Sequence, residues 1–120
     1  MILFRITAIA CVTLASLTSA IAEVKFATSA EFSSGIVGKS MSSTTAKGQR
    51  FTAMIKSGGT GDFQIEGKPV EHFKWKFTGN TFCWTFPNFT ECNHVELESA
   101  ASAKFIDAKS GKLNNAYVLQ

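Results

Sequence analysis

The feature that most restricts the fold of this chain is a segment of alternating aromatic residues around Gly79-Asn80. Aromatic side chains alternate with polar or charged ones on both sides of this dipeptide. Such alternation is typical of a strand with one buried face, and glycine followed by asparagine is typical of a two-residue hairpin turn. We therefore expect an antiparallel hairpin in which aromatic residues face one another. The expected pairs are Phe73 with Phe86, Trp75 with Trp84 and Phe77 with Phe82.

The aromatic residues of this hairpin would share one face, and they are the candidate binding residues. The set is Phe73, Trp75, Phe77, Phe82, Trp84 and Phe86. One interpretation is that they fill the core, because a small domain needs large apolar side chains to do so. The other is that so many rings overfill a small barrel and leave some exposed, where they would bind a partner. The sequence favours the core and leaves both interpretations open.

Two cysteines support the same register. If Pro87-Asn88 forms the next turn, Cys83 lies directly opposite Cys92, at a separation suited to a disulfide. The bridge would lie on the face opposite the aromatic residues and stabilise the domain by about 2–3 kcal/mol. The cysteine spacing differs from the Cys-x₂₋₄-Cys pairs of zinc sites, so we expect a disulfide and no metal.

The same period-two pattern extends through most of the chain, and turn-forming residues interrupt it at regular intervals. We expect about eight strands in an antiparallel barrel or sandwich. The expected strands are Lys39–Thr45, Phe51–Lys56, Phe63–Ile65, Val70–Thr78, Thr81–Phe86, Thr90–Leu97, Ala103–Asp107 and Leu113–Leu119. Thr28 and Glu31 have the spacing of a capping box, which predicts a short N-terminal helical turn.

The N-terminus has the pattern of a secretory signal peptide. Arg5 precedes an apolar stretch from Ile6 to Leu17, and the small-residue site Ala20-Ile21-Ala22 follows. We expect residues 1–22 to be cleaved and residues 23–120 to form a single β-domain in the periplasm or outside the cell. The apolar run is diluted by threonine and serine, so we expect no membrane span in the mature chain.

Charge and side-chain chemistry argue against several function classes. The formal net charge of +3 is too small for a strong nucleic-acid binder. His72 and His94 would lie at opposite ends of the hairpin, which disfavours a shared metal or acid–base site. The acidic residues Glu91, Glu96 and Glu98 could supply a carboxylate pair, but this alternation is more typical of a solvated strand edge. We therefore expect no catalytic residue and no cofactor, with an unrecognised carboxylate- or histidine-based site as the exception.

Several short motifs together resemble a group of short exported bacterial β-domains of unknown function. The shared segments are Ile36-Val37-Gly38-Lys39-Ser40, Phe73-Lys74-Trp75, Gly79-Asn80-Thr81-Phe82-Cys83-Trp84, Cys92 and Asp107-Ala108-Lys109-Ser110-Gly111. The chain differs from the group at Lys74, where a glycine is common. The resemblance implies a compact antiparallel β-domain and an envelope location, and it supplies no catalytic residues.

These observations predict a binding domain without enzymatic activity in the bacterial envelope. Its partner would be an envelope or extracellular protein or a small apolar ligand. Inhibition of a lysozyme or protease and transport of a small lipophilic ligand are the alternatives. An interior cavity lined by Trp75 and Trp84 would favour the lipophilic ligand, whereas a filled interior with exposed rings would favour the protein partner.

Overall fold

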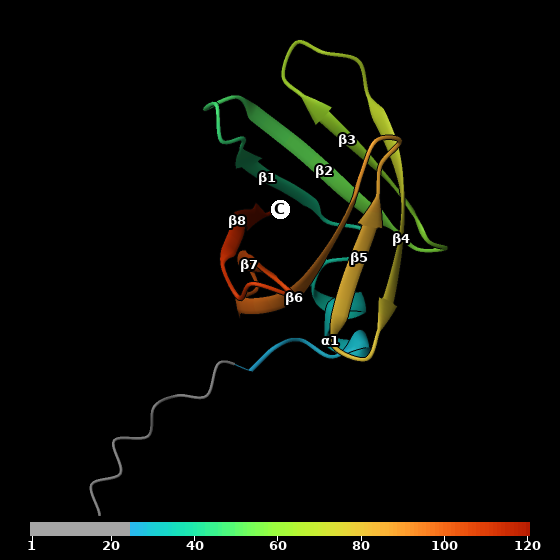
Figure 1. Cartoon of the computed structure of the whole chain (residues 1–120), viewed down its shortest axis with the longest axis vertical. Helices are drawn as coiled ribbons and strands as arrows, with labels where there is room; N and C mark the ends of the chain where they lie inside the picture. Colours follow the sequence, from blue (N-terminus) through green and yellow to red (C-terminus); the bar gives the residue numbers. More distant parts are fainter. Residues whose placement is uncertain (1–24) are drawn as a thin grey trace, which may run out of the picture.

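The computed structural model describes residues 25–120 and shows a closed barrel of antiparallel strands (Figure 1). The strands are β1 (Ser40–Thr44), β2 (Arg50–Lys56), β3 (Thr60–Ile65), β4 (Glu71–Thr78), β5 (Thr81–Thr85), β6 (Thr90–Ser99), β7 (Ser102–Asp107) and β8 (Leu113–Leu119). Each strand pairs with the next along the chain, and β8 pairs with β1 to close the barrel. The expected mainly β fold is confirmed, as a barrel and not a sandwich. The expected signal segment lies outside the described residues.

Strand β2 shows how the sequence pattern produces the barrel wall. Phe51, Ala53 and Ile55 are buried inside the barrel, while the residues between them are exposed. Successive side chains of a strand point to opposite faces, so strict alternation of apolar and polar residues gives one dry and one wet face. The strand therefore forms part of the core on its inner side and part of the molecular surface on its outer side.

The expected register of the aromatic hairpin is confirmed. Trp75 pairs with Trp84, Phe77 with Phe82 and Cys83 with Cys92. The ladder between β4 and β5 ends at Lys74 and Thr85, so the expected Phe73–Phe86 pair lies just beyond it. Their rings nevertheless pack together, with centroids 5.2 Å apart.

Gly79 and the disulfide show how this register is held. Gly79 has a φ of 64°, the left-handed conformation that a type II′ hairpin turn requires at its first central position. The Cys83–Cys92 disulfide joins β5 to β6 and follows the prediction from the sequence. Because Cys83 lies between the buried residues Phe82 and Trp84, its side chain points to the outer face of the barrel.

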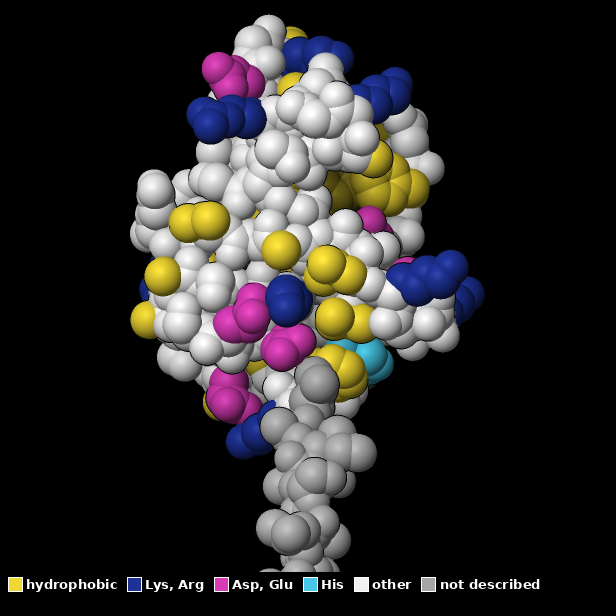
Figure 2. All heavy atoms as spheres, turned by 90° about the vertical axis from the view of Figure 1, so that its left-hand side faces the viewer, with side chains coloured by type: hydrophobic (Ala, Val, Ile, Leu, Met, Phe, Trp, Pro, Cys, Tyr) yellow, Lys and Arg dark blue, Asp and Glu magenta, His cyan; other side chains and the backbone are white. Residues whose placement is uncertain are grey.

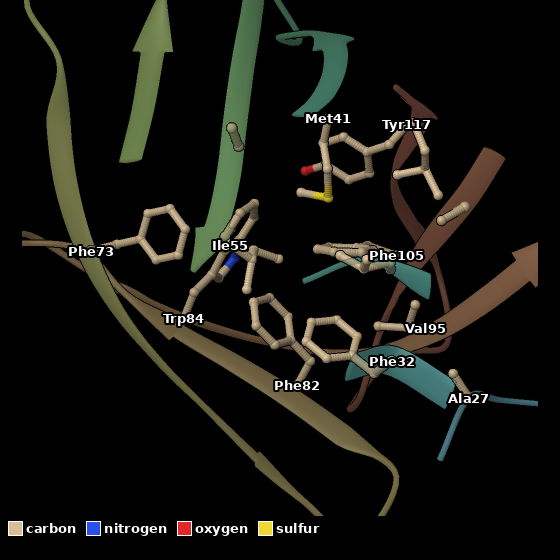
Figure 3. Packing of buried hydrophobic residues seen from close by; sticks show 14 of the residues in the cluster. Ala27, Phe32, Met41, Ile55, Phe73, Phe82, Trp84, Val95, Phe105 and Tyr117 are labelled. Carbon is tan, nitrogen blue, oxygen red and sulfur yellow. The ribbon is translucent and has the colours of Figure 1, made fainter. Parts of the chain in front are cut away.

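One end of the barrel is closed by helix α1 (Ser29–Gly35). Its N-terminus has the expected capping box, in which the Thr28 side chain accepts a hydrogen bond from the Glu31 backbone and the Glu31 side chain accepts one from the Thr28 backbone. The hydrogen bond that the Thr28 backbone N–H donates to the Glu31 carboxylate lowers the pKa of this carboxyl. Phe32 and Ile36 are fully buried among the strands, and Figure 3 shows Phe32 beside Phe82 in the core.

The strand order gives the barrel two distinct ends. The turns after β2, β4 and β6 lie at the end that α1 covers, which we call the closed end. The turns after β1, β3, β5 and β7, residues 45–49, 66–70, 86–89 and 108–112, lie at the other end. We call it the open end, because no helix of the described chain covers it (Figure 1).

Candidate functional site

The predicted binding residues divide between the two ends of the barrel. Trp75, Phe77 and Phe82 surround Phe32 at the closed end, with ring centroids 5.6, 5.0 and 4.9 Å from the Phe32 ring. Phe82 is fully buried, and Trp75 and Phe77 are half-buried against the core. The Trp75 indole N–H donates hydrogen bonds to two backbone carbonyls. These three side chains therefore form the contact between the barrel and its helix.

The other three predicted residues pack nearer the open end. Phe73, Trp84 and Phe86 contact one another, with ring centroids 5.2–5.3 Å apart, and all three are buried. The Phe73 ring occupies the space beside Gly61 on β3, where an added Cβ would lie only 2.1 Å from the Phe73 ring. Most of the predicted set thus belongs to the core, and only Trp84 and Phe86 also line the hollow at the open end.

A pocket of about 360 Å³ opens at this end of the barrel, and we call it the mouth pocket. Its aromatic walls are Phe51, Phe63, Trp84, Phe86, Phe89 and Tyr117, and its other lining residues are Thr45, Ile65, Glu71, Glu91, Asn114 and Asn115. Figure 2 shows a hollow on this side of the molecule with hydrophobic side chains inside it and acidic side chains beside it. The pocket combines mostly apolar walls with a few polar groups, as small-molecule sites do.

The polar side of the mouth pocket is built on a hydrogen-bonded chain. The Glu91 carboxylate accepts hydrogen bonds from the indole N–H of Trp84 at 3.3 Å and from the side-chain amide of Asn93 at 2.8 Å. The Asn93 side chain is fully buried and accepts a bond of 2.7 Å from Asn114. Because buried polar groups are costly unless they are hydrogen-bonded, these contacts hold Glu91 in one orientation.

Tyr117 supplies a second polar group. Its side chain is only 3% exposed, and its ring packs against Phe105 and Phe51. Burial, and after it the negative charge of Glu91, raises the pKa of Tyr117 far above the ordinary tyrosine value, so the hydroxyl stays protonated. Figure 3 shows that the hydroxyl points toward the middle of the barrel.

Sequence reasoning missed Glu91 and Tyr117 as site residues. Glu91 was grouped with Glu96 and Glu98 as a solvated edge, yet it pairs with Trp84 and so shares the inner face of the barrel. Glu96 lies on the outer face of the same strand, an odd number of residues away from Glu91. The signal that identifies Glu91 is therefore its place in the predicted register.

The histidines lie outside this site and apart from each other. The His72 ring forms a 2.7 Å contact with Asp62 on the outer face, and Asp62 also contacts Lys56. The lysine, and after it the histidine, lowers the pKa of Asp62. His94 instead stacks on Phe26, with ring centroids 4.6 Å apart. Within residues 25–120, no group of three or more histidine, cysteine, aspartate or glutamate side chains is placed to bind a metal.

Two larger hollows of about 490 and 670 Å³ lie elsewhere on the surface. The lining of the smaller hollow includes Lys56, Asp62, His72 and Lys74. The larger hollow is lined mainly by polar and charged side chains, among them Arg50, Gln64 and Glu66, together with Phe51 and Val118. Their polar linings are mostly exposed side chains, which are less rigidly held than the packed rings of the mouth pocket. The mouth pocket is therefore the candidate functional site.

Neither a membrane-spanning helix nor a related protein points to a function for the part of the chain that the structure describes. Among the helices in residues 25–120, none is long and apolar enough to cross a membrane. Comparison of the chain with protein-family models, curated proteins and solved structures finds no match. The mouth pocket is therefore the feature of the molecule that points to a function.

Proposed function

We propose that this protein is an exported, non-enzymatic domain that binds a small, partly apolar ligand in the mouth pocket. The observation that supports this proposal is that α1 fills the closed end of the barrel, whereas an aromatic pocket of about 360 Å³ remains at the open end. A packed core holds the walls in place before any ligand arrives, so binding requires little reorganisation of the protein. The Glu91 carboxylate and the Tyr117 hydroxyl would orient the polar part of the ligand.

The proposed location is the periplasm or the outside of the cell. The disulfide between Cys83 and Cys92 supports it, because such bonds persist in oxidising compartments. The expected signal peptide is the second argument. A ligand carried in this compartment must cross water, and an aromatic pocket with one polar side would shield its apolar part during that passage.

A fluorescence titration with the neutral dye N-phenyl-1-naphthylamine tests the proposal. The dye brightens when it leaves water for an apolar site, and we expect saturable binding to one site per protein. Phe89→Ala removes an exposed part of the pocket wall and should weaken binding severalfold. Val118→Ala is the matched control, because Phe89 and Val118 are both 54% exposed but Val118 does not line the mouth pocket. Absence of saturable binding, or equal effects of the two substitutions, would contradict the proposal.

A second candidate function is suggested by the rim of the open end. Val70, Phe89 and Leu113 are large exposed hydrophobic residues, and all three lie in or beside the turns of this end. Exposed apolar side chains that gather in one place are typical of protein interaction sites. The rim would then cover part of a protein such as a lysozyme or protease and inhibit it. In that case, substitution of Val70 or Leu113 by alanine would abolish inhibition of the enzyme, and dye bound in the pocket would not affect this inhibition.

A further inference from the structure

We infer that the ligand of the mouth pocket is a small organic ammonium cation with apolar substituents. This inference rests on the proposed function and specifies the chemical class of the ligand. Three features of the pocket carry it: the charge of its lining, the arrangement of its aromatic rings and a tyrosine hydroxyl that faces the pocket from a largely buried side chain. The residues that provide these features lie on different strands: Glu71 on β4, Trp84 on β5, Glu91 on β6 and Tyr117 on β8.

The charged residues that line the pocket are both acidic. They are Glu71 at the start of β4 and Glu91 on β6, and no lysine or arginine is found among the lining residues. Glu91 is only partly exposed, and a carboxylate in such surroundings is screened less by salt than one on the open surface. The lysines of the surrounding turns are exposed and form no part of the lining. A cation therefore gains more from this pocket than a neutral or anionic ligand of the same shape.

The aromatic walls favour the same kind of ligand. The faces of Trp, Tyr and Phe rings attract cations, and sites for alkylated ammonium groups commonly combine several such rings with a carboxylate. The Trp84 indole packs edge-on against Phe73 and Phe86, and its N–H donates to Glu91, so ring and carboxylate are held together. Because Trp84 is only 4% exposed, the rings most open to an ammonium group beside Glu91 are the more exposed lining residues Phe63 and Phe89.

Tyr117 gives an independent indication that the pocket is built for a ligand. No hydrogen bond is found between its hydroxyl and any other group of residues 25–120. Within residues 25–120, every fully buried side-chain nitrogen or oxygen has a hydrogen-bond partner. Because the Tyr117 hydroxyl has none, its oxygen is not fully buried and faces the open space of the pocket that Tyr117 lines. A side chain that is 97% buried, with its one polar atom left to the pocket, is suited to a hydrogen bond with a bound molecule.

The test compares three ligands of similar size and different charge. These are benzyltrimethylammonium, neopentylbenzene, which has carbon in place of the cationic nitrogen, and phenylmethanesulfonate, which is an anion. Each is used to displace the neutral dye from the intact oxidised protein. We expect the cation to displace the dye at a concentration at least about tenfold lower than the neutral compound, and the anion to be weakest. Equal displacement by all three, or a preference for the anion, would overturn the inference.

Isosteric variants connect the charge preference to the pocket. Glu91→Gln keeps an oxygen that can accept from Trp84 and Asn93 but removes the charge. It should reduce the preference for the cation over the neutral compound, measured as a ratio within the same variant, to less than about threefold. Glu96→Gln is the control on the outer face of the same strand, and it should keep the full preference. Glu71→Gln, at an exposed position, should reduce the preference in part and provides a second variant if Glu91→Gln does not fold.

The outcomes separate the inference from the function on which it rests. If the dye does not bind, the proposed ligand-binding function fails. If the dye binds and both the cation and its neutral analogue displace it equally, the pocket binds small ligands and only the inferred cation preference is wrong. If Glu91→Gln and Glu96→Gln reduce the preference equally, the preference comes from overall charge and the assignment to the mouth pocket is overturned.

Discussion

The closed and open ends of the barrel contain similar aromatic side chains, but these side chains have different roles at the two ends. At the closed end, the Phe32 ring from α1 is inserted among Trp75, Phe77 and Phe82, and the interior there is filled. At the open end, no helix of residues 25–120 covers the rings, and a pocket remains. One aromatic hairpin therefore stabilises the barrel at one end and lines a candidate site at the other. The comparison shows that a core residue and a binding residue can differ only in what covers them.

The largest effect is expected from removing the ring that fills the closed end. Phe32→Ala would leave a cavity among three aromatic rings, and large-to-small changes of this kind cost about 3–5 kcal/mol. Chemical denaturation, with the free energy of unfolding extrapolated to water, measures this loss. A change below about 1 kcal/mol would mean that α1 does not stabilise the closed end, and the contrast between the ends would fail.

A smaller effect is expected at the disulfide, which lies between the two ends on the outer wall. The double substitution Cys83→Ser and Cys92→Ser should lower the free energy of unfolding by about 2–3 kcal/mol, because the unfolded chain loses its cross-link. Reduction of the wild-type protein should have the same effect on thermal unfolding. Mass spectrometry of the exported protein before reduction checks the bond itself, and two free thiols would contradict it.

The ionisation of Tyr117 measures how well the core near the open end is shielded from water. Tyr117 is the single tyrosine of the chain, so its ionisation can be followed by absorbance without interference from others. Its pKa is raised in the folded state, so between the unfolded value near 10 and the folded value the unfolded state binds fewer protons. Stability is therefore full below about pH 10 and falls by up to about 1.4 kcal/mol per pH unit above it. Tyr117→Phe should remove this part of the alkaline loss, and an ordinary tyrosine titration in the folded protein would contradict the burial.

The smallest effect on stability is expected at the rim of the open end. Phe89 is half-exposed and stacks on Phe86, so Phe89→Ala should change the free energy of unfolding by less than about 1 kcal/mol. Its main effect should be on dye binding. Thermal unfolding of Phe89→Ala and Phe32→Ala under the same conditions compares the contributions of the two ends to stability. A loss as large as that of Phe32→Ala would show that the open end is also part of the structural core.

The pairing of the central strands could be predicted because it depends on local features. The Gly79 turn fixes which residues face one another, and a slip of one strand by one residue would turn the aromatic rings of that strand outward. The Cys83–Cys92 pair follows from the next turn in the same way. Closure into a barrel could not be predicted, because it depends on pairing between β1 and β8, at opposite ends of the described chain.

The site was harder to predict than the fold. The inward position of Glu91 was already contained in the predicted register, but its acidic neighbours on the outer face suggested a solvated edge. Tyr117 could not be placed, because the ladder between β7 and β8 shifts register between Phe105 and Ile106. Such an irregularity changes which side chains face inward, and no turn motif in the sequence reports it.

Closure of the barrel also limits how any protein could associate with it. Every strand of residues 25–120 has a paired neighbour on each side, so none is an edge strand along its whole length, although the seam between β1 and β8 is only two residue pairs long. An extended peptide therefore finds no fully free strand to pair with, and such strand addition is a common route to both recognition and aggregation. Association should therefore depend mainly on side chains, and three of the five large exposed hydrophobic residues found in residues 25–120, Val70, Phe89 and Leu113, lie in or beside the turns of the open end.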